Sequence, residues 1–288
     1  MALEIGILFA IITMLSWGTA DIFAKKAINK IGYKTALLLN QATVIIPLIV
    51  LAILFFKPPP LTPELILITF SAGILGIIAY IFLYRIFQKG NVSVVSPISA
   101  SWSVITTLLA VFLFQETLVP LQIVGIIAVF IGIFFASTNL SELKKSIREG
   151  RTSGISDALI SMVAWGITYT LLRPLSIAFG PIIALLFVRI NAITILFSWT
   201  KSTKTKISTT TRLIFLFIAL AGLLDLLGFL AFNFSISTAF LSIVGPVAAT
   251  YPAVTIVLAY FFLKEKIVNN QKIGIIAILA RLTLMSLT

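Results

Sequence analysis

The sequence contains no cysteine and no histidine, and only 10% of its 288 residues are charged. Disulfide bonds, zinc sites built from Cys and His, thiol nucleophiles and imidazole proton relays are therefore excluded. Any chemistry must use carboxylates, amines, guanidinium groups, hydroxyls, amides or aromatic rings. Acidic residues number 9 against 21 lysines and arginines, so the formal net charge is +12. The positions of these few charges therefore carry much of the information.

Apolar residues make up 60% of the chain, and the mean hydropathy is +1.16, which excludes an ordinary soluble domain. About 20 apolar residues cross the roughly 30 Å hydrocarbon layer of a bilayer as a helix. Ten such stretches follow one another, at residues 5–27, 35–56, 64–87, 92–114, 121–138, 154–177, 181–200, 212–236, 241–263 and 271–287. The sequence therefore predicts an all-α membrane protein with ten transmembrane helices.

The two halves of the chain repeat each other. At an offset of 148 residues, seven of the thirteen positions in 6–18 are identical to those in 154–166, including the Trp-Gly pair. At an offset of 149, residues 72–128 align without a gap to residues 221–277, with matched Pro, Thr, Glu, Gln and Gly positions. Apolar composition alone does not produce such matches at one register, so the sequence indicates an internal duplication.

Each half contains five predicted spans, so the second half must enter the membrane from the opposite side. We therefore expect two inverted five-helix repeats, at residues 1–138 and 154–288, joined by a linker at 139–153. Transporters built from inverted repeats place their substrate site near the midplane, where the repeats meet. The linker alternates Leu and Ile with Lys and Arg, which fits a short helix on an anionic membrane surface as well as it fits a plain connection.

The basic residues fall mainly on one side of the predicted membrane. Seventeen lysines and arginines lie in the connections of one face, three lie on the other face, and Arg189 lies within a span. The positive-inside rule makes the rich face cytoplasmic, so both termini are expected outside a multi-pass protein of the plasma membrane. The positive charge is thereby explained as a topology signal. No soluble face is long enough for nucleic-acid binding.

Four large aromatic residues lie near the middle of their spans, although Trp and Tyr prefer the interfaces of a bilayer. Trp17 and Trp165 are equivalent positions of the repeat, and so are Trp102 and Tyr251. Packing inside a helix bundle explains a single such ring. Four rings at symmetry-related depths favour a shared cavity that binds a small-molecule substrate.

Three charged residues also lie within spans. An Asp or Arg at a helix centre costs about 2.5–3.5 kcal/mol on insertion scales, so it must face a partner or water. Arg189 and Asp225 are central in their spans, and Asp21 lies one turn after Trp17 on the same helix face. One interpretation is a structural ion pair between Arg189 and Asp225. The other is contact with a charged or zwitterionic substrate or a coupling proton, in which case Asp225→Asn abolishes transport.

Further residues with amide or phenol side chains are weaker candidates, because such groups also serve as hydrogen bonds between helices worth about 0.6 kcal/mol each. They are Asn40, Gln41, Tyr80, Tyr84, Tyr169, Asn191 and Asn233. Four of them, Asn40, Gln41, Tyr80 and Tyr169, join the four aromatic and three charged residues above in a predicted substrate site of eleven residues. Glu116 and Glu265 end the fourth and ninth spans near the surface, and we interpret them as structural caps. The fifth and tenth spans lack acidic residues and contain glycines, so we expect them to be scaffold.

The same residues occur in the same order in each half: Trp-Gly in the first helix, Pro at the start of the fourth, and Glu, Gln and Gly around the turn into the fifth. They are Trp17, Gly18, Pro97, Glu116, Gln122 and Gly125, and again Trp165, Gly166, Pro246, Glu265, Gln271 and Gly274. In this each half resembles the EamA domain of the drug/metabolite transporter superfamily. The resemblance implies a ten-helix secondary carrier that exports or exchanges small metabolites such as amino acids. It also implies a cavity formed by helices 1–4 and 6–9. Many relatives have cytoplasmic termini, whereas the charge count places these termini outside.

The leading hypothesis is therefore secondary transport by alternating access, with no cofactor. An intramembrane enzyme is the second class of function. It would have to act without metal, thiol or imidazole, and the chain has no Gly-x-Ser-x-Gly elbow. A passive channel is the third. The chain has no P-loop, so transport driven by ATP would need a partner protein. The sequence alone gives neither the substrate nor the oligomeric state.

Overall fold

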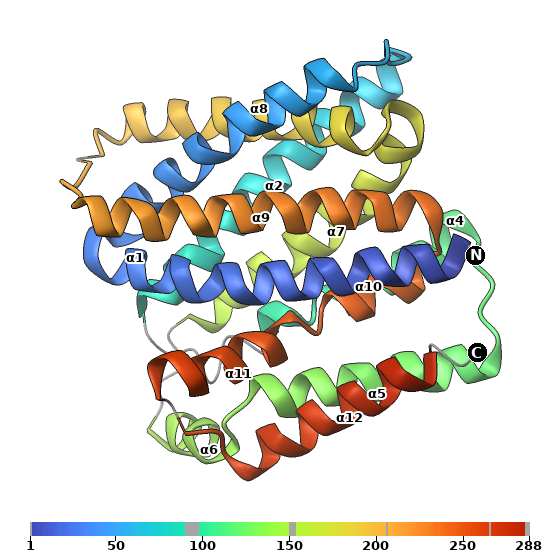
Figure 1. The fold of residues 1–288 in the computed structure, drawn as a ribbon, viewed down its shortest axis with the longest axis vertical. Coiled ribbons are helices and arrows are strands. Elements are labelled where there is room, and N and C mark those ends of the chain that lie inside the picture. Colours follow the sequence, from blue (N-terminus) through green and yellow to red (C-terminus); the bar gives the residue numbers. More distant parts are fainter. Residues whose placement is uncertain (1, 90–97, 150–153, 206, 265, 286–288) are drawn as a thin grey trace.

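The computed structural model describes residues 2–89, 98–149, 154–205, 207–264 and 266–285. The described chain is helical, with short connections. The helices in order are α1 (Ala2–Leu54), α2 (Pro63–Lys89), α4 (Trp102–Phe114), α5 (Pro120–Ser137), α6 (Leu140–Arg148), α7 (Ile155–Phe179), α8 (Pro181–Ser202), α9 (Arg212–Thr238), α10 (Leu241–Ala248), α11 (Tyr251–Leu263) and α12 (Asn269–Met285). Figure 1 shows most of them as long rods that run side by side.

The helices correspond to the ten predicted spans. A break inside α1 divides it into two spans, and a second break divides one span into α10 and α11. Seven helical stretches of the described chain are long and apolar enough to cross a membrane, and residues 98–114 form a shorter apolar helix. α1 contains the first two predicted spans, and α12 corresponds to the tenth. The prediction of an all-α protein with ten membrane helices in two repeats is confirmed. Pro97 and Glu265, which were singled out in the sequence, lie outside the described residues.

The break inside α1 is the same structure as the turn between α7 and α8. Gly32 has φ 76° and ψ 157°, and Gly180, which lies 148 residues later, has φ 79° and ψ 154°. This region of backbone space is essentially reserved for glycine. The first and second spans are therefore two helices joined at Gly32, just as α7 and α8 are joined at Gly180.

Replacing Gly32 or Gly180 with alanine is expected to destabilise the protein by about 1–3 kcal/mol, through backbone strain alone. A Cβ at either position would meet no atom within 4 Å, so no clash contributes. Gly76→Ala is the matched control, since Gly76 lies within α2 and its Cβ would make an ordinary 3.6 Å contact with Thr168. Thermal unfolding of the three variants in detergent measures the difference. Equal melting temperatures for Gly32→Ala and Gly76→Ala would contradict this account of the break.

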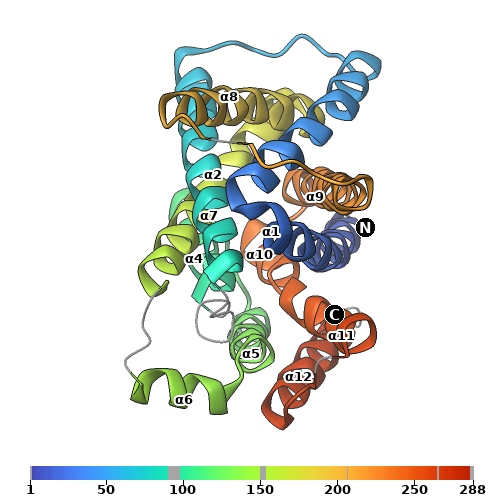
Figure 2. The same ribbon diagram turned by 90° about the vertical axis from the view of Figure 1, so that its left-hand side faces the viewer.

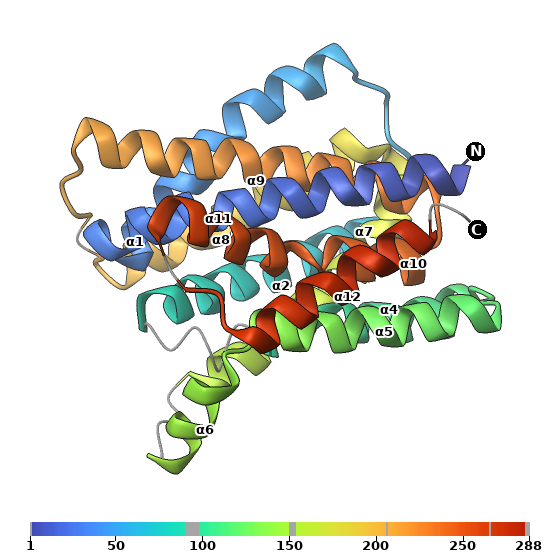
Figure 3. The same ribbon diagram turned by 60° about the horizontal axis from the view of Figure 1, so that its bottom comes forward.

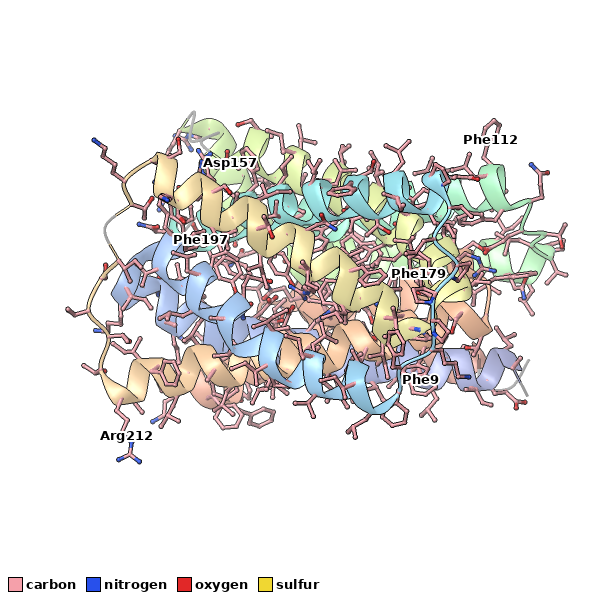
Figure 4. The ribbon with its side chains drawn as sticks, turned by 90° about the horizontal axis from the view of Figure 1, so that it is seen from above. Phe9, Phe112, Asp157, Phe179, Phe197 and Arg212 are labelled. Carbon is pink, nitrogen blue, oxygen red and sulfur yellow. The ribbon has the colours of Figure 1, made fainter. Side chains whose placement is uncertain are left out.

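The inversion of the repeats is visible in the positions of equivalent residues. Phe9 and Asp157 occupy the same place in the two halves, 148 residues apart, yet they lie at opposite ends of the molecule (Figure 4). Their partners are equivalent as well. Phe9 stacks on Phe234 with ring centroids 5.4 Å apart, whereas Asp157 pairs with Arg85 at 3.5 Å. One contact of the ancestral fold is therefore aromatic in one copy and ionic in the other.

The two halves interlock through equivalent hydrogen bonds. The Thr106 hydroxyl donates to the carbonyl oxygen of Gly166 at 3.0 Å, and the Thr255 hydroxyl donates to that of Gly18 at 3.1 Å. A Cβ on Gly18 would lie 2.7 Å from the backbone oxygen of Tyr251, so glycine is needed for this close helix contact. The first helix of each half thus packs against the fourth helix of the other half.

α5 and α12 form a separate pair beside the other helices. Figures 1 and 3 show them side by side, and Figure 2 shows them below α1, α2 and α9. Gly132 and Gly274 meet where the two helices cross. At their first turns, Gln122 accepts a hydrogen bond from the Val119 amide, and Gln271 accepts one from the Val268 amide, each at 3.1 Å. This arrangement agrees with the expected scaffold role.

The predicted linker contains the helix α6, which projects from the same end as the α11–α12 turn (Figure 3). Its Leu143 packs against buried Ile86 and Ala158, while Lys144, Lys145 and Arg148 are exposed. Of the two interpretations of this segment, the structure favours the short amphipathic helix over a plain connection.

Candidate functional site

A cavity lies between the two halves, and both contribute to its walls. Fifteen of the described residues line it, from α1, α2, α4, α7, α9 and α11. Nine of the eleven residues predicted to bind substrate are among them: Trp17, Asp21, Asn40, Tyr80, Trp102, Trp165, Tyr169, Asp225 and Tyr251. Tyr84, a weaker candidate outside these eleven, also lines it. The sequence therefore located the cavity at the interface of the repeats.

The walls of the cavity are mainly aromatic. Tyr169 lies at the centre of the group, with its ring centroid 5.0 Å from that of Trp165, 5.4 Å from Trp17 and 4.3 Å from Trp102. Tyr80 packs edge-on against Trp165 at 4.7 Å. Such pairs add about 0.5–1.5 kcal/mol each beyond the burial of their area. The rings therefore hold one another in a fixed arrangement around the cavity.

Trp17 depends on a glycine for its position. A Cβ on Gly228 would lie 2.5 Å from Cδ1 and 2.6 Å from Nε1 of the indole. The indole Nε1 is buried and has no hydrogen-bond partner among the described residues. Trp17 thus lines the cavity while its indole donor is unused. A buried unsatisfied donor costs about 1–3 kcal/mol. Such a cost in a native protein needs an explanation, and a functional role is one.

A buried polar group forms one wall. Arg189 donates from Nη2 to Asp225 at 2.8 Å and to the Tyr80 hydroxyl at 2.9 Å, and from Nη1 to Gln41 at 2.8 Å. The Tyr80 hydroxyl in turn donates to both carboxylate oxygens of Asp225, at 2.8 and 2.7 Å. Arg189 and Gln41 do not line the cavity and lie behind this wall. The ion pair considered from the sequence is therefore present, and it belongs to the cavity wall.

The bond between Arg189 and Gln41 joins equivalent positions of the repeat. The two residues are 148 residues apart, which is the offset of the Trp-Gly pair and of the two glycine turns. Two equivalent residues can touch only close to the axis that relates the halves. The polar group therefore lies near the pseudo-two-fold axis, where a site shared by both repeats is expected.

The helices that carry Trp102 and Tyr251 are broken just before these residues. Ser101 has φ −75° and ψ 7°, and Thr250, 149 residues later, has φ −76° and ψ 1°. The predicted span at 241–263 is present but interrupted, because α10 ends at Ala248 and α11 begins at Tyr251. Pro252 contributes, since it has no amide hydrogen to continue the helical bonds. Broken helices at membrane depth are typical of transporter binding sites.

The cavity is small in this conformation. Its volume is about 40 Å³, room for about three water molecules at 10–15 Å³ each. A metabolite with many heavy atoms therefore does not fit until helices move apart. Among the described residues, no three acidic side chains come together in a group able to hold a metal ion.

One central cavity residue was missed in the sequence. Phe229 contacts Trp17 at 5.1 Å, and the guanidinium carbon of Arg189 lies 4.4 Å from the centre of its ring. It is the repeat equivalent of Tyr80, so the 149-residue alignment could have identified it. Asn191 and Asn233, by contrast, bond to Phe187 and Phe229 of their own helices, and Asn233 also to Ser176. These two amides do not line the cavity.

A second polar cluster lies away from the cavity and also joins the halves. Glu116 accepts hydrogen bonds from the amides of Leu241 and Ser242, both at 2.9 Å, and from the Ser242 hydroxyl. Arg173 lies 3.4 Å from the same carboxylate and donates to the carbonyl oxygens of Ile236 and Ala239. The interpretation of Glu116 as a cap is correct, and its helix is α10. Although it ends a span, Glu116 is only 4% exposed, so its carboxylate faces protein groups.

Comparisons with known proteins agree with this architecture. A model of the EamA-like transporter family matches residues 4–138 and again residues 152–287. A protein of Lactococcus lactis, named provisionally as a sugar uptake protein, is 30% identical over 179 residues, covering 60% of this chain and 59% of that protein. An uncharacterized transporter of Archaeoglobus fulgidus is 27% identical over 200 residues, covering 69% and 68%.

Two further matches concern the repeat and the fold. An uncharacterized protein of Methanocaldococcus jannaschii is 29% identical over 137 residues, which is 47% of this chain and 98% of that protein. That relative therefore has about the length of one repeat. A crystal structure superposes with a TM-score of 0.75 at 13% identity, covering 98% of this chain and 96% of the other. At that identity the likeness shows a shared fold.

Proposed function

Because the chain belongs to the EamA-like transporter family of the drug/metabolite transporter superfamily, we propose that it is a secondary carrier that works by alternating access. It is an integral multi-pass membrane protein. The substrate is a small metabolite, an amino acid or similar solute, that is exported or exchanged. The eleven residues singled out in the sequence contribute to its site, nine of them directly and Gln41 and Arg189 through the polar wall.

The observation that carries this proposal is the cavity between the inverted halves. It lies close to the axis that relates the repeats, and it is too small for a solute in this conformation. A carrier needs such a state, in which the site is shielded from at least one side. A permanently open pore does not, since its path stays wide enough for the solute.

The test is solute counterflow in proteoliposomes without ATP. The purified protein should accelerate the uptake of labelled solute into vesicles preloaded with unlabelled solute, and the rate should saturate with concentration. A flux that rises linearly with concentration would indicate a channel. Conversion of the solute into a new compound by the purified protein would indicate an enzyme.

We also propose that both termini face the outside of the plasma membrane. The beginning of α1 and the end of α12 lie on the same side of the molecule (Figure 1). The basic connections lie on the opposite side, among them the segment before α9, whose Arg212 is labelled at the end near Asp157 (Figure 4). By the positive-inside rule that side is cytoplasmic.

A reporter enzyme fused after Thr288 is expected to be active only outside the cytoplasm. The reason is the excess of lysine and arginine on the opposite face, since such a bias sets the orientation of a membrane protein. Paired fusions of alkaline phosphatase and green fluorescent protein measure the location. Fluorescence without phosphatase activity would place the C-terminus in the cytoplasm and reverse the orientation.

A further inference from the structure

The charges at the cavity are unequally paired. Arg189 and Asp225 neutralise each other at 2.8 Å, Tyr80 forms hydrogen bonds with both, and Gln41 accepts a further bond from Arg189. Asp21 lines the same cavity, and within the described chain it makes no hydrogen bond or ion pair. The carboxylates of Asp21 and Asp225 repel each other, and the nearest opposing charge on the same helix is Lys25, one turn further on. When Asp21 is ionised, the cavity therefore has one negative charge in excess.

The remaining walls suit a cation. Eight of the fifteen lining residues are aromatic, and the faces of aromatic rings attract positive charge, by about 2 kcal/mol or more where water is excluded. The Arg189 guanidinium already uses this attraction, since its carbon lies 4.4 Å from the centre of Phe229 and 5.0 Å from that of Tyr80. Tyr84 and Tyr251 line the same cavity as Asp21, so further aromatic rings are available to a cation there.

The cavity offers little to an anion. The guanidinium of Arg189 is occupied by Asp225, Tyr80 and Gln41 and lies behind the wall. The other cations among the described residues lie outside the lining. A carboxylate or phosphate would approach Asp21 and Asp225 with no free positive charge to offset the repulsion.

We propose that the cavity takes a solute with an ammonium or quaternary ammonium group, with Asp21 as its counter-charge and the aromatic rings around it. The excess charge selects a cationic group, and the ring faces favour one that is poorly hydrated. This inference rests on the proposed carrier function, because the cavity must widen before such a solute enters. It makes Asp21, and not the paired Asp225, the residue that determines the sign of the substrate's charge.

The experiment compares probes of the same shape that differ in charge. Choline and its uncharged isostere 3,3-dimethylbutan-1-ol form one pair, and n-butylammonium and n-butanol form a second. Binding to the purified full-length protein is followed by quenching of tryptophan emission, since Trp17, Trp102 and Trp165 line the cavity. We expect each cation to bind at least tenfold more tightly than its neutral partner.

Variants of Asp21 assign this preference to a residue. Asp21→Asn should reduce the preference for the cations at least tenfold without weakening the binding of the neutral probes, and Asp21→Glu should retain it. Glu64→Gln removes an acid that is exposed in the first turn of α2, and it should leave the preference unchanged. Thermal unfolding identifies a variant that fails to fold, and the comparison of Asp21→Glu with the unmodified protein then still tests the proposal.

The outcomes separate this inference from the carrier function. No preference for the cations, or a preference that persists in Asp21→Asn, would overturn the assignment of Asp21. Saturable counterflow of a neutral sugar or an anion, equal in the Asp21→Asn variant, would also overturn it while leaving alternating access in place. Failure of the carrier function itself would appear as linear flux of every solute.

Discussion

Replacing Arg189 with glutamine is expected to lower the stability of the protein by about 3–5 kcal/mol, because the change leaves Asp225 as a buried carboxylate without its partner. The Arg189 side chain is 3% exposed and that of Asp225 is 13% exposed, so water compensates neither charge. The melting temperature of the protein in detergent measures the effect. The matched control is Arg212→Gln, which removes an exposed arginine at the start of α9 and should change the stability by at most about 0.5 kcal/mol.

The ion pair between Asp225 and Arg189 affects how the transport of the Asp225→Asn variant can be interpreted. That single variant leaves Arg189 as a buried cation without a carboxylate, so a loss of transport would not distinguish a lost site from a damaged fold. The double variant Arg189→Gln with Asp225→Asn removes both charges and keeps groups of similar shape that can bond to Tyr80 and Gln41. Neutral replacements of a buried ion pair are often tolerated. We expect this double variant to recover most of the stability lost in either single variant.

Transport by the double variant then separates the two interpretations of the pair. A purely structural ion pair predicts that counterflow recovers together with the melting temperature. A role in the transport cycle predicts a stable protein without counterflow, and this is the result we expect because Asp225 lines the cavity. A double variant that is stable and transports normally would remove the pair from the functional site.

Much of the site could be predicted from the sequence, because two signals were independent of side-chain packing. The first was depth, since a charge or a Trp in mid-span needs a special environment. The second was the repeat, which paired Trp17 with Trp165 and Trp102 with Tyr251. Together they identified residues that line one cavity, although α1, α4, α7 and α11 are far apart in the chain.

Other features could not be predicted because they depend on contacts between helices. Phe229 is one apolar residue among many in α9, and hydropathy does not say which of them faces a cavity. The partners of Gln41 and Glu116 lie in the opposite half, and a span count does not give distances across the interface. The burial of Glu116 likewise depends on its packing against α10, which the end of a predicted span does not reveal.

Because Glu116 is buried, its replacement is expected to have the second large effect on the stability of the protein. Glu116→Ala would leave the amides of Leu241 and Ser242 without their acceptor and Arg173 without its nearby carboxylate. We expect a loss of about 3–5 kcal/mol in stability, as for other broken buried ion pairs. Ser242→Ala removes one hydroxyl contact and should cost about 1 kcal/mol, and Glu142→Ala in exposed α6 should cost almost nothing. A melting temperature of Glu116→Ala equal to that of Glu142→Ala would contradict the role of the cluster.

The cluster also joins the halves, so its loss should change access to the cavity. Glu116 belongs to the first repeat, while Arg173 and Ser242 belong to the second, and any separation of the halves at this place must break their contacts. Since the chain has no cysteine, a single cysteine at Ala20 in the cavity wall can report access to a membrane-impermeant thiol reagent. Glu116→Gln, the milder change, should raise the labelling rate at Ala20→Cys from the side of the termini. Labelling that is unchanged from both sides would show that these contacts hold the fold together without restricting entry to the cavity.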